Sequence, residues 1–238
     1  MREAGKMLEE VHNKLADFVK PGISTLEIDQ FGEKAIRDLG CVPNFLNYNG
    51  YPASICVSVN DEVVHGIPSK DRILQDGDIV SLDAGLIHEG YHSDAARTHA
   101  VGNISEEAKR LIEVTKQSFF EGIKLAVPGN HLFDISEAIQ KYVESNGYSV
   151  VRDLVGHGIG THLHEDPKIP NFKQRRKGMK LRPGMTLAIE PMVNEGSYDV
   201  VWLDDDWTVV TEDGSLAAHY ENTIVITEDG CEILTLSE

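Results

Sequence analysis

Four carboxylates and one histidine occur in sequence contexts that are typical of metal ligands: Asp83, Asp94, His157, Glu190 and Glu221. Asp83 and Glu190 each follow a stretch of apolar or small residues, at 80–82 and 187–189, which contains no Lys or Arg. A buried carboxylate needs a partner for its charge, and a divalent cation supplies one. Four carboxylates and an imidazole are too many for one tetrahedral zinc, and they suit two ions about 3.5–4 Å apart.

The candidate ligands come in matched pairs, which indicates an internal duplication. Asp83 pairs with Glu190, Asp94 with Glu221, and His157 with His65. The matched segments occur in the same order: 21–22 with 128–129, 65–67 with 157–159, 76–83 with 183–190, and 92–94 with 219–221. Two copies predict an α+β fold in which the site lies on a pseudo-twofold axis. We expect one catalytic domain over 1–238, with halves of about 1–104 and 105–238.

Each half is expected to contain two helices followed by strands that carry the ligands. Apolar residues at helical spacing predict helices up to about residue 19, over 24–40, over 105–126, and from a cap at Asp134 to about 147. Ser24 and Glu27 form a predicted capping box. Strands are predicted near 54–60, 78–83, 92–101, 149–155, 185–190, 207–211 and 217–227.

Composition and charge narrow the range of partners. The 238 residues are 41% hydrophobic and 26% charged, as in an ordinary globular protein, and the net charge is −17. This charge would repel a phosphate backbone, so nucleic acid is excluded as the main ligand. No apolar run approaches the ~20 residues of a membrane helix. The charged N-terminus is unlike a signal peptide, and the three widely spaced cysteines indicate free thiols. We therefore expect a cytoplasmic protein.

Five sequence strings resemble those of type I methionine aminopeptidases, and together they span essentially the whole chain. They are GYPASIC at 50–56, VVHGIP at 63–68, GDIVSLD at 77–83, GHGIG at 156–160 and IEPM at 189–192. The resemblance implies the pita-bread fold, in which helices cover an antiparallel sheet. It also implies hydrolysis at the N-terminal residue of a peptide, by an enzyme that depends on two divalent metal ions.

The resemblance assigns a role to each candidate ligand. Asp94 and Glu221 would bridge the two ions, Asp83 would complete one shell, and His157 with Glu190 would complete the other. Glu190 would also relay a proton to the departing amine. The implied ions are Co, Mn, Fe(II), Ni or Zn, among which oxygen-rich ligation favours Mn, Fe(II) or Co over a thiolate-type zinc site.

Two further histidines match catalytic positions of the family. His164 would donate a hydrogen bond to the scissile carbonyl, and His65 would contact the substrate near the scissile nitrogen. The resemblance implies that the methionine pocket is lined by Tyr48, Tyr51, Cys56, Leu163 and Trp207. Leu163 replaces an aromatic residue that is often found there. His92 and His219 flank ligands and could support them. Ordinary structural roles are expected for His12, His88, His99, His131 and His162.

The function implied is removal of the initiator methionine from nascent polypeptides when the second residue is small. We expect a monomer with a transient ribosome contact, although the acidic segment 199–214 would be repelled by the ribosome. One alternative is an Xaa-Pro aminopeptidase or dipeptidase, which usually carries an additional N-terminal domain for which 238 residues leave no room. The other is an inactive pita-bread module that binds peptides, which would be expected to have lost ligands.

Overall fold

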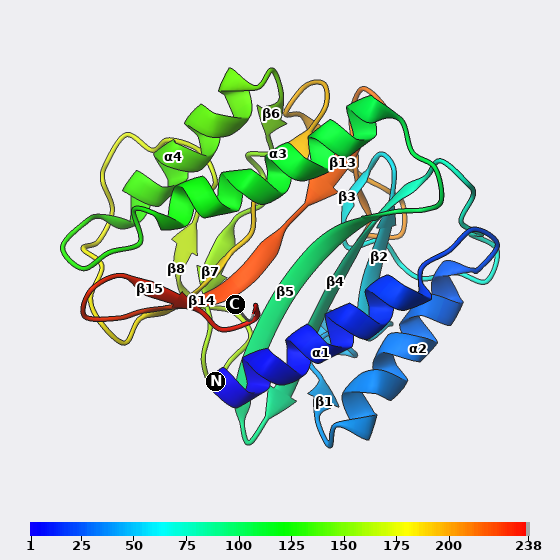
Figure 1. Ribbon diagram of the computed structural model, residues 1–238, viewed down its shortest axis with the longest axis horizontal. Coiled ribbons are helices and arrows are strands. Elements are labelled where there is room, and N and C mark those ends of the chain that lie inside the picture. Colours follow the sequence, from blue (N-terminus) through cyan, green and yellow to red (C-terminus); the bar gives the residue numbers. More distant parts are fainter. Residues whose placement is uncertain (237–238) are drawn as a thin grey trace.

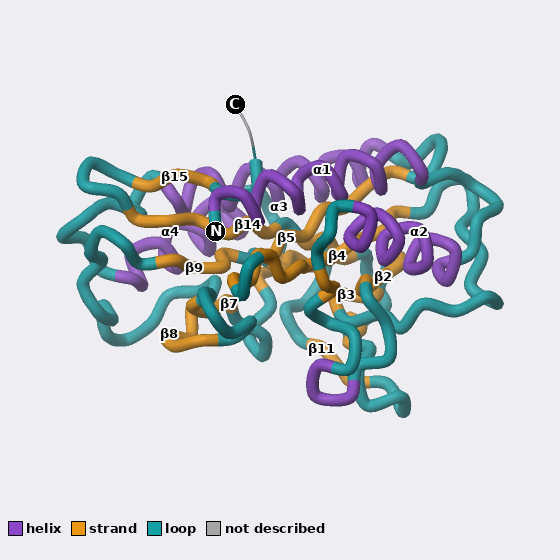
Figure 2. Tube along the Cα trace, turned by 90° about the horizontal axis from the view of Figure 1, so that it is seen from below, coloured by secondary structure: helices purple, strands orange, loops and turns teal. Residues whose placement is uncertain are grey.

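The computed structural model describes residues 1–236 as one layer of helices over a curved, antiparallel sheet (Figures 1 and 2). The helices are α1 (Arg2–Phe18), α2 (Thr25–Asp38), α3 (Glu106–Ile123) and α4 (Leu132–Ser145), with a short 3₁₀ turn at Tyr48–Gly50. Figure 2 shows the helices on one side of the strands, with long loops on the other side. None of the helices in the described part of the chain has the length and hydrophobicity needed to cross a lipid bilayer.

The main sheet contains nine strands among the described residues, and its order joins the two halves of the chain. The hydrogen-bonded order is β1-β4-β5-β14-β9-β7-β8, while β2 pairs with β4 and β15 with β14. The bounds are β1 (Val42–Pro43), β2 (Ile55–Val59), β4 (Ile79–His88), β5 (Tyr91–Ala100), β7 (Gly156–Gly158), β8 (Glu165–Ile169), β9 (Thr186–Ile189), β14 (Glu221–Ile226) and β15 (Cys231–Ile233). Strands β4 and β5 of the first half thus correspond to β9 and β14 of the second.

Two smaller sheets lie beside the main one. One has the order β13-β10-β6, and the other has the order β11-β12-β3. Their bounds are β3 (Glu62–Val64), β6 (Ser149–Val150), β10 (Met192–Asn194), β11 (Val200–Trp202), β12 (Val209–Thr211) and β13 (Ala217–His219). Both sheets pair segments that are far apart in the sequence, and β11 extends away from the helix layer in Figure 2.

Each helix pair buries its apolar side against its own half of the sheet. Leu8, Leu15 and Ile28 of the first pair are completely buried, as is Phe119 of the second pair. Burial of each such side chain stabilises the fold by about 1.5–3 kcal/mol. The helices therefore hold one face of the sheet, which leaves the other face for the polar side chains described below.

The predicted helices are present, but one begins at a different residue. Ser24 Oγ accepts from the backbone N–H of Glu27 at 3.2 Å, and the Glu27 carboxylate accepts from the N–H of Ser24 at 2.8 Å, so the capping box is confirmed. The predicted cap at Asp134 is wrong, because α4 begins at Leu132 and its cap residue is His131. The Asp134 carboxylate instead accepts from the backbone N–H of His131 at 2.8 Å, which is the reciprocal part of such a box.

Several predicted strands differ in length. Strand β4 continues to His88, well beyond the predicted end at 83. The predicted strand at 149–155 is only Ser149–Val150, and the predicted strand at 217–227 is divided at Tyr220 into β13 and β14. Because of this division, β13 pairs within a small sheet and β14 within the main sheet. Such pairing depends on residues far apart in the sequence, and the local alternation of residues does not predict it.

We predict that Gly66→Ala destabilises the fold around the pocket. A Cβ at Gly66 would lie 2.3 Å from the carbonyl oxygen of Val57, so one backbone segment would have to move. We expect a loss of about 1–3 kcal/mol in the free energy of unfolding, measured by urea denaturation. Gly230→Ala is the control, because nothing lies within 4 Å of the added Cβ. Equal unfolding midpoints for the two variants would contradict this close approach.

Candidate metal centre and substrate pocket

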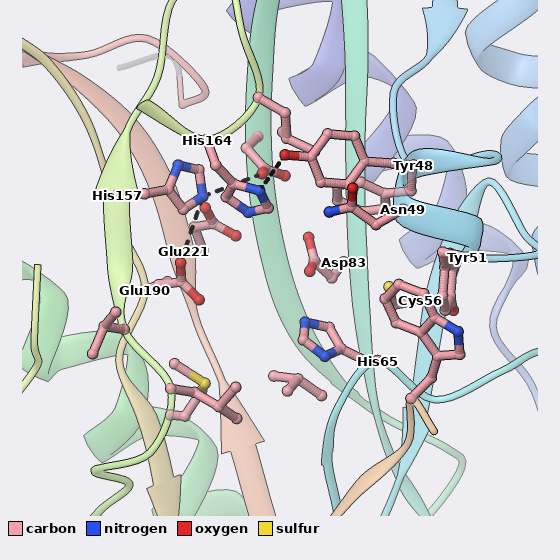
Figure 3. Close-up of a pocket in the computed structure, with 18 of the residues that line it drawn as sticks. Tyr48, Asn49, Tyr51, Cys56, His65, Asp83, His157, His164, Glu190 and Glu221 are labelled. Carbon is pink, nitrogen blue, oxygen red and sulfur yellow. Dashed lines mark hydrogen bonds and ion pairs between the residues drawn. The ribbon is translucent and has the colours of Figure 1, made fainter. Parts of the chain in front are cut away.

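A cavity of about 290 Å³ is lined by strands and loops, with no residue of the four helices among its lining. It contains all twelve site residues predicted from the sequence: Tyr48, Tyr51, Cys56, His65, Asp83, Asp94, His157, Leu163, His164, Glu190, Trp207 and Glu221. Figure 3 shows His157, Glu190 and Glu221 on one side of this pocket, Tyr51 and Cys56 on the other, and Asp83 between them.

The register of the main sheet explains why the carboxylates meet. Ala96 of β5 lies opposite Asp83 of β4 on one side and opposite Glu221 of β14 on the other. Paired residues share a face of a sheet, and so do residues two apart in one strand, which adds Asp94. The three carboxylates therefore project from the same face at the junction of the two halves.

The second half supplies the remaining two ligands by the same rule. Ala188 of β9 lies opposite His157 of β7 and opposite Thr223 of β14. Glu190 is two residues beyond Ala188, so it points to the face shared by His157 and Glu221. The prediction that Glu190 lies within a strand is wrong, because β9 ends one residue earlier, at Ile189.

The five side chains form a tight, buried group. Nε2 of His157 lies 3.8 Å from Oδ2 of Asp94 and 3.6 Å from Oε1 of Glu190. One ligand atom from each of Asp94, His157 and Glu221 falls within 4.8 Å of the others. The side chain of Asp94 is 5% exposed and that of Glu190 is 14% exposed, so water can neutralise little of their charge.

Burial raises the pKa of every carboxyl group in the cluster, and repulsion by neighbouring carboxylates adds to the shift in three of them. Burial raises the pKa of Asp83 to about 7. Burial, and then the neighbouring carboxylates, raise the pKa of Asp94, Glu190 and Glu221 well above the ordinary range. A protein without a compensating cation therefore has to hold protons on this cluster near neutral pH.

The donor set fits a divalent metal centre. Asp83 Oδ1, Asp94 Oδ1 and Glu221 Oε1 are buried and have no hydrogen-bond partner within residues 1–236. Buried oxygen atoms without partners are costly, and several of them around one space are what a cation would satisfy. Carboxylates with one imidazole suit Mn, Fe(II) or Co.

His157 is oriented as a ligand. Its Nδ1 lies 2.9 Å from the carbonyl oxygen of Gly158, which can only accept, so Nδ1 carries the proton. The lone pair of Nε2 then faces Asp94 and Glu190. Burial, followed by the charge of His164, lowers the pKa of His157 to about 4, so the neutral form needed for metal binding is present at neutral pH.

His65 and His164 border the same space from other segments. Nδ1 of His164 is 2.8 Å from the hydroxyl of Tyr48, and its ring centroid is 4.3 Å from that of His157. Burial, and then His164, lower the pKa of His65 to about 4. His65 has a left-handed backbone conformation, with φ of 59°, at the end of β3. Both imidazoles are therefore neutral near pH 7.

The opposite wall of the pocket is apolar. Tyr51, Cys56 and Leu163 are buried and belong to one hydrophobic cluster, against which Tyr48 and Trp207 pack. The Tyr51 and Trp207 rings are 5.1 Å apart in an edge-on arrangement. The Tyr51 hydroxyl donates to the carbonyl oxygen of Gly66 at 2.8 Å, which leaves its ring surface towards the cluster. Such a wall would accommodate an uncharged, polarizable side chain.

Two supporting residues were missed or underestimated from the sequence. The Arg97 guanidinium is buried against Tyr220 and donates to the backbone oxygen of Glu221. His219 is 1% exposed, and its Nε2 lies 3.8 Å from Oε2 of Glu190. Arg97 shares a strand with Asp94, but its approach to Glu221 depends on the pairing of β5 with β14. The pocket also contains Val64 and Met192, which lie in two of the quoted strings without a predicted role, and Phe45, Asn49, Asp153, Leu154 and Val155, which no short motif indicated.

The other histidines lie apart from the pocket. His12, His88, His92, His99, His131 and His162 are absent from the lining. His92 is held by its backbone, which donates to Gly160 at 2.8 Å, and its ring nitrogen is 3.5 Å from the Asn44 amide. The three cysteines are free thiols, as expected.

Comparisons with known proteins indicate a metallopeptidase. The model of metallopeptidase family M24 matches residues 1–228. A protein named methionine aminopeptidase from Clostridium acetobutylicum is 58% identical over 238 residues, covering 100% of this chain and 95% of that protein. The solved methionine aminopeptidase of Thermotoga maritima has a TM-score of 0.97 at 46% identity, covering 100% of this chain and 95% of that one.

A more distant likeness bears on the alternative that the sequence left open. The Xaa-Pro dipeptidase of Bacillus anthracis has a TM-score of 0.80 and 25% identity, and the match covers 100% of this chain but only 59% of that chain. These likenesses confirm the pita-bread α+β fold. The chain matches methionine aminopeptidases over nearly their whole length but Xaa-Pro enzymes over only part of theirs. The comparisons therefore favour methionine aminopeptidase over the Xaa-Pro alternative.

We predict that the metal-free protein loses stability as the pH rises from 6.5 to 8. The pKa of Asp83 is raised to about 7 in the folded state, and those of Asp94, Glu190 and Glu221 are raised well above the ordinary range, so folding retains protons that the unfolded chain has already released. Each such proton lowers the free energy of unfolding by up to ~1.4 kcal/mol per pH unit. Below pH 6.5 the histidines with lowered pKa values have the opposite effect. The unfolded chain binds protons on them that the folded protein does not, so their contribution to stability rises with pH.

Thermal melts in a chelator and in excess Mn(II) measure this difference. The melting temperature should fall with pH in the chelator and change less with Mn(II) bound, because the cations replace the retained protons. Asp83→Asn should flatten the chelator curve. Identical pH dependence in the two buffers would show that these carboxylates do not hold the metal.

Proposed function

This chain belongs to metallopeptidase family M24, and from that premise we propose that it is a metal-dependent aminopeptidase that removes the N-terminal methionine of polypeptides. The observation that carries the proposal is the position of the carboxylate and imidazole group beside an apolar pocket. The first feature provides a hydrolytic centre and the second a place for an uncharged side chain. Relatives named methionine aminopeptidase over the full length of the chain support the same function.

Two divalent ions would be held by Asp83, Asp94, His157, Glu190 and Glu221, with Asp94 and Glu221 shared between them. When bound, such ions polarise a peptide carbonyl and lower the pKa of water near neutrality. Mn, Fe(II) and Co fit the oxygen-rich donors best, while Ni and Zn are also accommodated by carboxylate and imidazole. Arg97 would position Glu221 through its backbone oxygen, and His219 would position the Glu190 carboxylate.

His164 would act on the carbonyl of the scissile bond. The Tyr48 hydroxyl, 2.8 Å away, can donate to Nδ1, which places the ring proton on Nε2. An Nε2–H donor in a buried pocket stabilises the oxyanion that develops during attack. Tyr48 thus positions His164 while it also packs against the apolar wall.

Glu190 and His65 would handle the proton and the amine. Glu190 lies beside His157 among the proposed ligands, where a carboxylate can accept a proton from water and pass it to the departing nitrogen. His65 lies across the pocket and is neutral, so it can accept a hydrogen bond from the N–H of the scissile bond. Each step uses a group whose protonation state the pocket has already set.

Substrate selection follows from the apolar wall. Tyr51, Cys56, Leu163 and Trp207, with Tyr48, would surround the methionine side chain, whose thioether packs favourably against aromatic rings. The cavity of about 290 Å³ is small, so a large second side chain would have little room beside the carboxylates. The preferred substrates are therefore nascent polypeptides that have a small second residue.

The proposal also covers the location, the oligomeric state and the domain organisation of the enzyme. We place the enzyme in the cytoplasm as a monomer whose residues 1–238 form a single catalytic domain, with pseudo-symmetric halves of about 1–104 and 105–238. Three free thiols support a reducing compartment. Contact with the ribosome would be transient, because Asp204, Asp205 and Asp206 make the β11–β12 hairpin acidic.

The activity is tested with three peptides that begin Met-Ala, Met-Leu and Ala-Pro. Chelated protein should cleave none of them, and added Mn(II), Fe(II) or Co(II) should restore cleavage of the Met-Ala peptide. The Met-Leu peptide should be cleaved at least ~10-fold more slowly, since exclusion of a larger side chain is worth about 1–3 kcal/mol. Cleavage of Ala-Pro alone would identify an Xaa-Pro peptidase, and metal binding without any cleavage would identify a binding module.

Substitution of the histidines separates substrate contacts from metal ligands. His65→Ala and His164→Ala should keep the wild-type metal content and lower kcat by ~10²–10⁴. His157→Ala should lose metal affinity as well as rate. Metal analysis and steady-state kinetics on the same preparations measure both. If His65→Ala binds metal normally and keeps more than about a third of kcat/KM, its proposed contact with the substrate is wrong.

A further inference from the structure

A second group of metal-binding side chains lies outside the pocket, where α1 meets the end of the main sheet. The Sγ atom of Cys41 is 3.4 Å from Sδ of Met7 and 3.9 Å from Nδ1 of His88. We call Met7, Cys41 and His88 the soft-ligand cluster. The function proposed above uses none of them, and none of them lines the pocket.

The fold brings these residues together from three separate segments. Strand β1 pairs with β4 so that Val42 lies opposite Ile87, and continuation of that register puts Cys41 opposite His88. Met7 extends from α1, four residues after Glu3, so both side chains lie on one strip of the helix. The cluster is therefore fixed by a sheet register and a helix face, which are both rigid elements.

The surroundings prepare His88 to act as a ligand through Nδ1. A carboxylate oxygen of Glu3 is 3.5 Å from Nε2 of His88, which favours the tautomer with its proton on Nε2. The Nδ1 lone pair then faces the Cys41 sulfur. Glu3 and Glu89 also form an acidic group around the imidazole, which favours the approach of a cation.

The two distances from the Cys41 sulfur suit neighbouring ligands of one ion. Sulfur and nitrogen ligands lie about 2.0–2.3 Å from a bound transition metal. Separations of 3.4 and 3.9 Å between neighbouring ligand atoms then correspond to ligand–metal–ligand angles between a right angle and slightly more than 120°. A thioether, a thiol and an imidazole are the donors that select a soft ion such as Cu(I) over Mn(II) or Mg(II).

We propose that the soft-ligand cluster binds one Cu(I)-class ion through Met7 Sδ, Cys41 Sγ and His88 Nδ1. The residue Cys41 is 4% exposed, and burial raises the pKa of its thiol, so the free protein carries the proton on sulfur at neutral pH. Binding forms the metal–sulfur bond and releases that proton to solvent. The His88 side chain, 22% exposed, gives the ion a route from the surface.

Competition for Cu(I) tests this site on the full chain. The protein is titrated without oxygen against a coloured Cu(I) chelator, and it should withdraw one equivalent of Cu(I). The affinity should fall by at least ~10-fold in each of three variants: Cys41→Ser, Met7→Leu and His88→Gln. Loss of a residue that only orients a ligand already weakens metal binding by ~10-fold or more, and loss of the ligand itself should weaken it at least as much. Met7→Leu conserves volume, so it keeps the test valid if another variant folds poorly.

The other two cysteines provide matched controls. Cys231→Ser removes a partly buried thiol near the carbonyl oxygen of Ile123, and Cys56→Ser removes the thiol in the pocket. Neither should change Cu(I) uptake, and Cys41→Ser should cleave the Met-Ala peptide at the wild-type rate. The proposal is overturned if the wild type withdraws no Cu(I), if Cys41→Ser withdraws as much, or if Cys56→Ser is the variant that loses uptake. These outcomes do not depend on whether the chain is an aminopeptidase.

Discussion

Four carboxylates are buried together in one small cavity, where the two halves of the main sheet meet. Asp83, Asp94, Glu190 and Glu221 have little water around them, and the negative charges of the first three raise the pKa of neighbouring carboxyl groups. A cluster of this kind is unfavourable unless protons or cations neutralise it. Protons would occupy the oxygen atoms that bind metal, whereas cations neutralise the cluster through those same atoms. The fold must therefore be rigid enough to keep like charges together.

The duplicated architecture meets that requirement by placing the cluster where the two halves join. Pairing of β5 with β14 sets Asp83 and Glu221 on either side of Ala96. The helix pairs and their apolar cores lie on the other side of the sheet, so the stabilising contacts do not compete with the polar ones (Figures 1 and 2). The loops that carry His65 and His164 are then free to shape a pocket over a fixed metal centre.

The sequence predicted correctly that these five side chains meet in one pocket, because their types are unusual for apolar strands and because they recur in both halves. It also predicted the capping box at Ser24, which depends only on local chemistry. It could not predict the support that Arg97 gives to Glu221, since that contact joins residues paired across two strands. The contact between Cys41 and His88 was missed for the same reason. Register and long-range pairing decide these contacts, and neither is visible in a local pattern.

Anomalous diffraction from crystals saturated with Mn(II) would test directly whether the pocket holds two metal ions. We expect two Mn(II) peaks in the pocket, about 3.5–4 Å apart, with Asp94 and Glu221 between them. Asp83 should contact only one of the ions, and His157 with Glu190 should contact the other. A single peak at saturation, or peaks that lie away from these five side chains, would contradict a dinuclear centre.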